Sequence, residues 1–332
     1  MKIEMKRWIL AMMFVFAGAV AAYGDETVKP VTVTFYHTSD MHEHSEPLPR
    51  IAQLVADRKK KDPNVLLIDT GDWMNKGDLT PLNTRGEAIV AMMGAARYDA
   101  VIPGNHDFTY AAPRLVELVN KYSLPMLVAN FKWSKPPKSK APAPYRIYKL
   151  KGVTVGVIGT APPFAAKATG PSVKILPIIK TIAPIVAEVE KKADIIVLLT
   201  HLGPPADEEI IKALPRIDIL FGGHHHKKFK SLNYNKTTKT IMQHSGFFGE
   251  TIGEVVITWD GKKITERKSK LIKITSKMPQ SDAVKTVLDK YAPKKKATES
   301  TSTPSRRQKQ PVKHGSSPKK LSGNGASPQI IK

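Results

Sequence analysis

The sequence predicts an α/β protein with two stacked β-sheets. Between residues 25 and 292, short apolar stretches rich in β-branched residues alternate with stretches in which apolar residues recur at helical spacing. After residue 221, strand-like stretches follow one another directly. Repeated strand–helix units followed by further strands near the C-terminal end of this region favour two stacked sheets. A length of 332 residues, 41% of them hydrophobic and 24% charged, is ordinary for a globular chain and allows about two domains.

The first half of this region supplies strands and helices in alternation. Residues 31–38 are β-branched and aromatic, and residues 65–68 form a short apolar run, so both are expected to be strands. Residues 51–58 place apolar side chains on one helix face. Pro113 is acceptable in the first turn of a helix over 113–121. The other elements expected here are a helix over 86–96 and strands over 100–102 and 127–129.

The second half begins in the same way and ends in β-structure. The elements expected are strands over 153–158, 195–199 and 217–221, and helices over 178–192 and 208–214. Residues 240–243, 254–259 and 263–274 are then expected to form a meander, with a hairpin turn at Asp260-Gly261 and a short helix over 281–291 after it.

Residues 1–24 are predicted to be a secretory signal peptide. A basic start precedes an apolar run of 15 residues from Trp8 to Ala22, and Ala22-Tyr23-Gly24 fits a cleavage site. The alternative is an uncleaved N-terminal anchor. Either interpretation makes the rest of the chain an exported protein, periplasmic or secreted.

Residues 293–332 are predicted to be a disordered basic tail, because they contain almost no core-forming residues. This tail carries +9 of the net charge of +23, and residues 25–292 carry +12, which fits an anionic substrate. The tail is either a solvated extension or an electrostatic tether to an anionic cell envelope. Specific nucleic-acid binding is not expected, because aromatic and basic residues are not interleaved. The expected organisation is a signal peptide (1–24), one domain (25–292) and the tail.

The chain contains no cysteine, so a metal site must use nitrogen and oxygen donors. Polar residues come directly after five of the predicted strands. In α/β sheets the carboxyl ends of the strands form one ligand-binding edge, so these residues should lie together. Asp72 could bridge two ions, and the donors together exceed what a single ion needs. His224 and His226 are expected to point the same way from an extended segment. The residues expected to converge are Asp40, His42, Asp72, Asn105, His106, His201, His224 and His226.

These motifs resemble those of the calcineurin-like metallophosphoesterases, and within them the 5′-nucleotidase/UDP-sugar hydrolase branch. The resemblance covers about Val33 to Trp259 and implies a four-layer α/β/β/α sandwich with a single catalytic domain. It rests on Asp40-Met41-His42, Gly71-Asp72, Tyr98-Asp99-Ala100, Gly104-Asn105-His106-Asp107, Thr200-His201-Leu202-Gly203 and Gly223-His224-His225-His226.

The resemblance also implies roles for these residues. Asp40, His42 and His226 would bind a first divalent ion, and Asp72 would bridge to a second. The remaining ligands of the second ion would be Asn105, His201 and His224. A metal-activated hydroxide would attack phosphorus, with His106 as the catalytic histidine that contacts the phosphoryl group or the leaving oxygen. Donors of these types accept Zn, Mn, Fe and similar ions.

Two departures from the branch stand out. Thr109 occupies the position at which the branch carries an aspartate that orients the catalytic histidine. The nucleotidases of the branch also clamp the base with a C-terminal domain, whereas only one short helix and the basic tail are expected here after Ile274. Asp107 is next to His106 but is expected to point elsewhere. His44 is a candidate substrate contact, whereas His37 and His244 are expected to be structural.

The function expected from these features is that of an exported dinuclear-metal phosphoesterase acting on small phosphate esters, nucleotides first among them. One alternative is another hydrolase on the same scaffold, either a cyclic-nucleotide diesterase or a thiosulfohydrolase. The other is a non-catalytic envelope-binding protein in which the basic tail carries the function.

Overall fold

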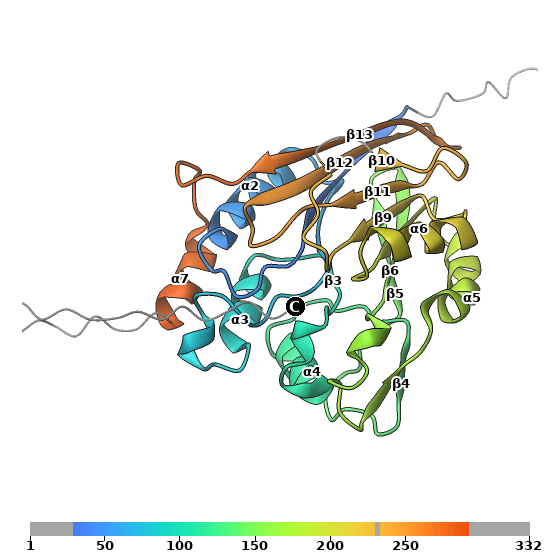
Figure 1. Cartoon of the computed structure of the whole chain (residues 1–332). Helices are drawn as coiled ribbons and strands as arrows, with labels where there is room; N and C mark the ends of the chain where they lie inside the picture. The colour runs from blue at the N-terminus through green and yellow to red at the C-terminus, as the bar shows by residue number, and fades with distance from the viewer. Residues whose placement is uncertain (1–28, 230–232, 292–332) are drawn as a thin grey trace, which may run out of the picture. The chain divides into compact units, whose positions relative to one another are not determined.

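The computed structural model of the chain describes residues 29–229 and 233–291 (Figure 1). The expected signal peptide and basic tail lie outside these residues. The described part contains six α-helices: α2 (Leu48–Lys61), α3 (Glu87–Ala95), α4 (Ala111–Lys121), α5 (Ile178–Glu190), α6 (Pro204–Ala213) and α7 (Asp282–Tyr291).

Two large sheets form the centre of the fold (Figure 1). The five-stranded sheet has the order β13 (Ile264–Lys273), β12 (Thr251–Trp259), β1 (Val31–Thr38), β2 (Val65–Asp69) and β3 (Ala100–Val101). The six-stranded sheet has the order β10 (Asn233–Tyr234), β11 (Ile241–His244), β9 (Ile219–Gly222), β8 (Ile195–Leu199), β6 (Val153–Gly159) and β5 (Tyr145–Leu150). β4 (Phe131–Trp133) and β7 (Val173–Ile175) pair separately.

Three buried apolar clusters show that the fold has four layers. One cluster lies between the two sheets, where Phe35 of β1 meets Phe221 of β9 with ring centroids 5.8 Å apart. A second joins the other face of the five-stranded sheet to α2, α3, α4 and α7. A third joins the six-stranded sheet to α5 and α6. The layers are therefore helices, sheet, sheet and helices, which confirms the predicted fold class.

The predicted β-meander is wrong. β12 and β13 do form an antiparallel hairpin in the five-stranded sheet, but β11 pairs in parallel with β9 in the six-stranded sheet. The chain changes sheets in the turn at residues 245–250. Apolar alternation marks each segment as a strand but does not say which sheet it joins, because both sheets offer an apolar face. The stretch 127–129 does not form a strand: Met126 and Leu127 make isolated bridges, and a turn begins at residue 129.

The topology brings the polar loops to one edge. β1, β2 and β3 run parallel, and so do β6, β8 and β9, so their carboxyl ends gather the loops that follow them. β2 and β8 are buried along their whole length, as expected of parallel strands covered on both faces.

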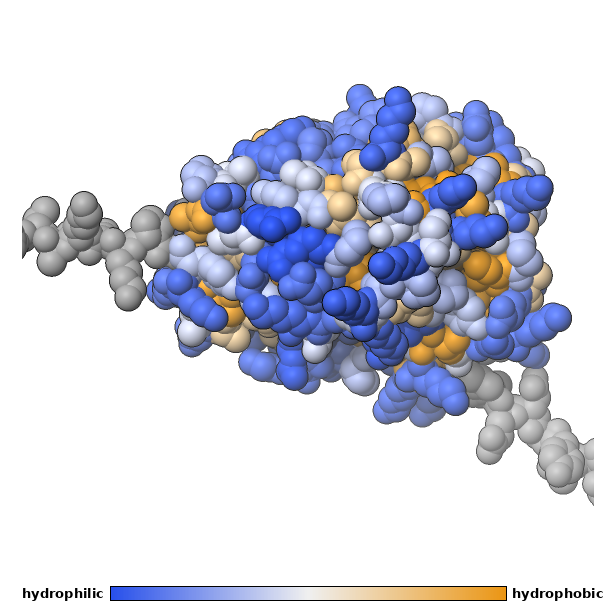
Figure 2. Space-filling model, turned by 90° about the horizontal axis from the view of Figure 1, so that it is seen from below, coloured by the Kyte–Doolittle hydropathy of each residue, from blue (hydrophilic) through white to orange (hydrophobic). Residues whose placement is uncertain are grey.

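The face shown in Figure 2 is largely hydrophilic, with hydrophobic residues in small separate areas. Among the described residues, only Phe164 and Ile179 are exposed large hydrophobic side chains. No helix in the described ranges has the length and apolar character needed to cross a membrane.

Candidate metal centre

Six of the predicted ligands converge in two groups of three. Within each group, one ligand atom from every residue lies within 4.8 Å of the others. The first group is Asp40, His42 and His226, and the second is Asp72, His201 and His224.

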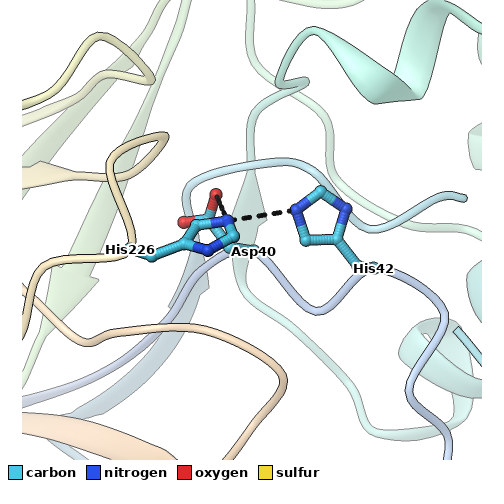
Figure 3. A group of neighbouring side chains, drawn as sticks. All are labelled: Asp40, His42 and His226. Carbon is cyan, nitrogen blue, oxygen red and sulfur yellow. Dashed lines mark hydrogen bonds and ion pairs between the residues drawn. The ribbon is translucent and has the colours of Figure 1, made fainter. Parts of the chain in front are cut away.

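The first group joins the loop after β1 to the loop after β9 (Figure 3). His226 Nε2 lies 3.3 Å from His42 Nε2 and 3.4 Å from Asp40 Oδ1. Burial alone would raise the pKa of Asp40, but the hydrogen bond from His226 and the charge of His201 lower it. Burial lowers the pKa of His42 to about 4. An anionic oxygen beside two imidazole nitrogens is a donor set for a divalent transition metal.

Asp72 belongs to the second group and also faces the first. Its Oδ2 is 3.2 Å from His201 Nε2 in the second group and 3.8 Å from His42 Nε2 in the first. The other oxygen, Oδ1, accepts a hydrogen bond of 2.8 Å from the backbone N–H of His106. One carboxylate therefore faces both groups, as the prediction of a bridging ligand requires.

The backbone selects the tautomer of His201. Its ring is fully buried, and Nδ1 lies 2.6 Å from the carbonyl oxygen of Thr70. A carbonyl oxygen can only accept, so Nδ1 carries the proton and Nε2 faces Asp72. Ligating histidines in metal sites are held in this way by the ring nitrogen that does not bind the ion.

Asn105 provides an independent test of whether an ion fits. Its Oδ1 is buried and has no hydrogen-bond partner among the described residues. An unsatisfied buried amide oxygen is costly, by about 1–3 kcal/mol. A cation coordinated by this oxygen would supply the missing partner, and the next residue, His106, binds Asp72 of the second group through its backbone N–H. The residues present therefore fit two divalent ions.

The loops that carry these residues have unusual backbone conformations. Most non-glycine residues avoid positive φ, at a cost of about 1–2 kcal/mol each. Such residues cluster where function requires them. The candidate ligands with positive φ are Asp40 (53°), His42 (47°), Asp72 (59°), His224 (80°) and His226 (54°).

The expectation that His224 and His226 share an extended segment and point the same way is therefore wrong. Both residues have a left-handed backbone conformation, and their rings lie in different groups. The cause is the sharp turn that ends β9, which periodicity along a strand does not describe.

Asp107 ties two of the site loops together, a role that the sequence did not indicate. Its buried carboxylate accepts backbone N–H bonds from Asp72 (2.8 Å), Trp73 (2.8 Å), Met74 (3.0 Å) and Gly104 (2.7 Å). As expected, Asp107 does not orient the His106 ring. The only sign in the sequence is an acid after Gly-Asn-His.

Gly104 is needed where the two loops meet. A Cβ added there would lie 2.2 Å from Asp72 Oδ1 and 2.5 Å from its backbone nitrogen. The side chain that faces both metal groups thus packs directly on the Gly104 backbone.

His106 is half-buried and lies outside both groups, with its ring centroid 5.0 Å from that of His42. Burial is the main cause of its lowered pKa. The Thr109 hydroxyl donates to the backbone oxygen of His106, at 2.6 Å, and so does not orient the ring.

Packing explains two other histidines, His37 and His244, whereas His44 stays a candidate substrate contact. His37 is buried and pairs with the Thr70 hydroxyl at 2.9 Å, and burial lowers its pKa to about 3. His244 Nε2 pairs with the buried Asp207 at 2.9 Å. The His44 ring contacts Phe248, with centroids 4.0 Å apart.

Metal binding is expected to release protons. Burial opposes a charge on His201, but Asp72 and Asp40 outweigh it and raise the pKa of His201 to about 10 in the metal-free protein. Only the neutral ring can ligate, so an ion entering at pH 8 must displace this proton, and its affinity must fall as the pH falls. Calorimetric titration with Mn²⁺ in buffers of different ionisation enthalpy should report at least one proton released per chain, with more if metal-bound water also ionises. Metal binding without proton release would contradict this account of His201.

Comparisons with known proteins agree with this geometry. The chain is 26% identical over 231 residues to the uncharacterized metallophosphoesterase YunD of Bacillus subtilis, covering 68% of this chain and 50% of YunD. It is 24% identical over 306 residues to the Bos taurus 5′-nucleotidase, covering 79% of this chain and 53% of that protein. The chain thus spans about half the length of these relatives.

The fold is also similar to that of a 5′-nucleotidase precursor from Thermus thermophilus. The TM-score is 0.70 and the identity 26%, over 79% of this chain and 58% of that one. The sequence profile of the calcineurin-like phosphoesterases matches residues 33–228. The chain therefore belongs to the calcineurin-like phosphoesterase family.

Proposed function

We propose that this chain is a metal-dependent hydrolase of small phosphate esters, with nucleotides as the main substrate class. The observation that carries the proposal is the Asp72 carboxylate, which faces both three-residue groups. A shared carboxylate between two adjacent sites is what two-metal hydrolysis needs. The names of relatives, such as the Bos taurus 5′-nucleotidase, favour nucleotides.

Each residue of the site has a defined part in this proposal. Asp40, His42 and His226 would hold one ion, and Asn105, His201 and His224 would hold the other, with Asp72 available to both. When bound, two divalent ions would polarise water for attack on phosphorus and offset the charge of the phosphoryl oxygens.

His106 acts next to the ions rather than as a ligand. With its pKa lowered by burial, the ring is mostly neutral at pH 7 and donates through one nitrogen to a phosphoryl or leaving oxygen. Thr109 does not replace a carboxylate partner, because its hydroxyl is bonded to the backbone.

We also propose that the protein is exported. The support is the sequence of residues 1–24, with its basic start and apolar run. The domain is assigned to residues 25–292, with the basic segment 293–332 following it. Secretion can be checked by comparing the location of the full chain with that of a chain lacking residues 2–24.

A substrate screen tests the activity. Purified protein with Mn²⁺, Co²⁺ or Zn²⁺ is expected to release phosphate from nucleoside 5′-monophosphates, and excess chelator should abolish the release. Cyclic nucleotides and a thiosulfate ester in the same screen distinguish the diesterase and thiosulfohydrolase alternatives. No hydrolysis of any ester with any of the three metals would contradict the proposal.

A further inference from the structure

Phe164 is the most exposed large hydrophobic side chain among the described residues. It is 54% exposed, against 39% for Ile179. A phenylalanine left in water forgoes the stabilisation that burial would provide, so its exposure does not serve the fold.

The loop that carries Phe164 is fixed. Pro162 and Pro163 restrict its backbone just before the ring, and its neighbours Ala161 and Ala165 are buried. Asn130 anchors the start of the loop through two hydrogen bonds of 2.8 Å to the backbone of Ala161. Phe164 is thus presented by a rigid loop.

Phe164 stands next to the metal groups. Its loop follows β6, the parallel neighbour of β8, whose own loop carries His201. The Phe164 ring lies against His224 of the second group, with centroids 4.7 Å apart and planes tilted by 39°. On the first group, Phe247 stacks on His226 at 4.8 Å, but it is only half-exposed and lies under Lys228. Of these two rings, Phe164 is the one with a large free surface.

We propose that Phe164 is a specificity-determining residue that stacks the planar aromatic part of the leaving group, the nucleobase of a nucleotide. The inference rests on the proposed phosphoesterase function and adds a base-recognition surface within the catalytic domain. A phosphate held at the metal groups places the rest of the ester near their rim, where this ring is exposed. Aromatic stacking tolerates every base, because each base has a flat π-face.

Two substrates that differ only in the base test the proposal. Adenosine 5′-monophosphate and ribose 5-phosphate carry the same phosphate and sugar. Phe164→Ala is expected to lower the ratio of kcat/KM for the nucleotide over the sugar phosphate by about 10- to 100-fold. Phe164→Tyr should keep the ratio near that of the wild type, because it keeps the ring.

Ile179→Ala is the matched control, since it removes the other exposed large hydrophobic side chain and should leave the ratio unchanged. Bound metal is measured for each variant, so that damage to His224 is recognised. An unchanged ratio in Phe164→Ala with normal metal content would overturn the inference. If the wild type cleaves ribose 5-phosphate but not the nucleotide, base recognition fails while the phosphoesterase function stands. If it cleaves neither, the proposed function fails as well.

Discussion

Replacing Asp72 by asparagine is expected to lower kcat/KM for a nucleotide by on the order of 10³-fold or more. Its carboxylate faces both groups, at 3.2 Å from His201 and 3.8 Å from His42. Loss of the shared anion weakens the binding of both ions. Metal stabilisation of the transition state contributes several kcal/mol, so activity should fall with it. Steady-state phosphate release, with bound metal determined on the same sample, measures the effect.

Asp57→Asn provides the matched control for this change. Asp57 has an exposed side chain on α2, is bonded to Gln53 and Lys60, and belongs to neither metal group. It should retain full activity and metal content. If Asp72→Asn behaved like Asp57→Asn, Asp72 would not be a bridging ligand.

Replacing His106 by asparagine is expected to lower kcat by about 10²- to 10³-fold while both ions stay bound. The ring lies outside both ligand groups, so its loss removes a hydrogen bond to a phosphoryl or leaving oxygen without removing a ligand. The backbone bond from His106 to Asp72 survives the substitution. Measuring kcat together with metal content separates this variant from a ligand variant.

His225→Asn serves for comparison, because His225 is exposed and belongs to neither group. It should lose less than about 10-fold, the low end of what indirect partners of a metal site contribute. A His106→Asn protein that loses metal in proportion to activity would instead identify His106 as a ligand.

Much of the site could be predicted from the sequence because strand ends can be recognised locally. Each apolar run that ends in a polar residue marks a loop, and parallel strands bring such loops together. That is why Asp40, Asp72 and His201, which lie far apart in the chain, were expected at one edge and are found there.

The rest depends on contacts that no local pattern records. Asp107 binds the backbone of residues 72–74, about 34 positions earlier, and Asp207 pairs with His244, 37 positions later. The assignment of β11 and β12 to different sheets depends on which apolar face each strand covers. The left-handed turn at 224–226 replaces the extended geometry that a strand pattern implies.

The converged ligands partly stabilise one another without ions, at a cost in backbone strain. Asp40 and Asp72 are buried anions with lowered pKa values, close to the charged His201. Several of the loop residues add strained backbone conformations. An arrangement of this kind persists because the packing beneath it, including the Asp107 bonds, holds the loops in place.

The most direct test of the two-ion account is a metal titration of chelator-treated protein. Mn²⁺ is added stepwise, and bound metal and phosphate release from a nucleoside monophosphate are measured at each step. The account predicts saturation at two ions per chain, with activity restored as the second ion binds. The Asp72→Asn protein should show neither two-ion saturation nor restored activity. Saturation at a single ion with full activity, or activity that persists without metal, would contradict it.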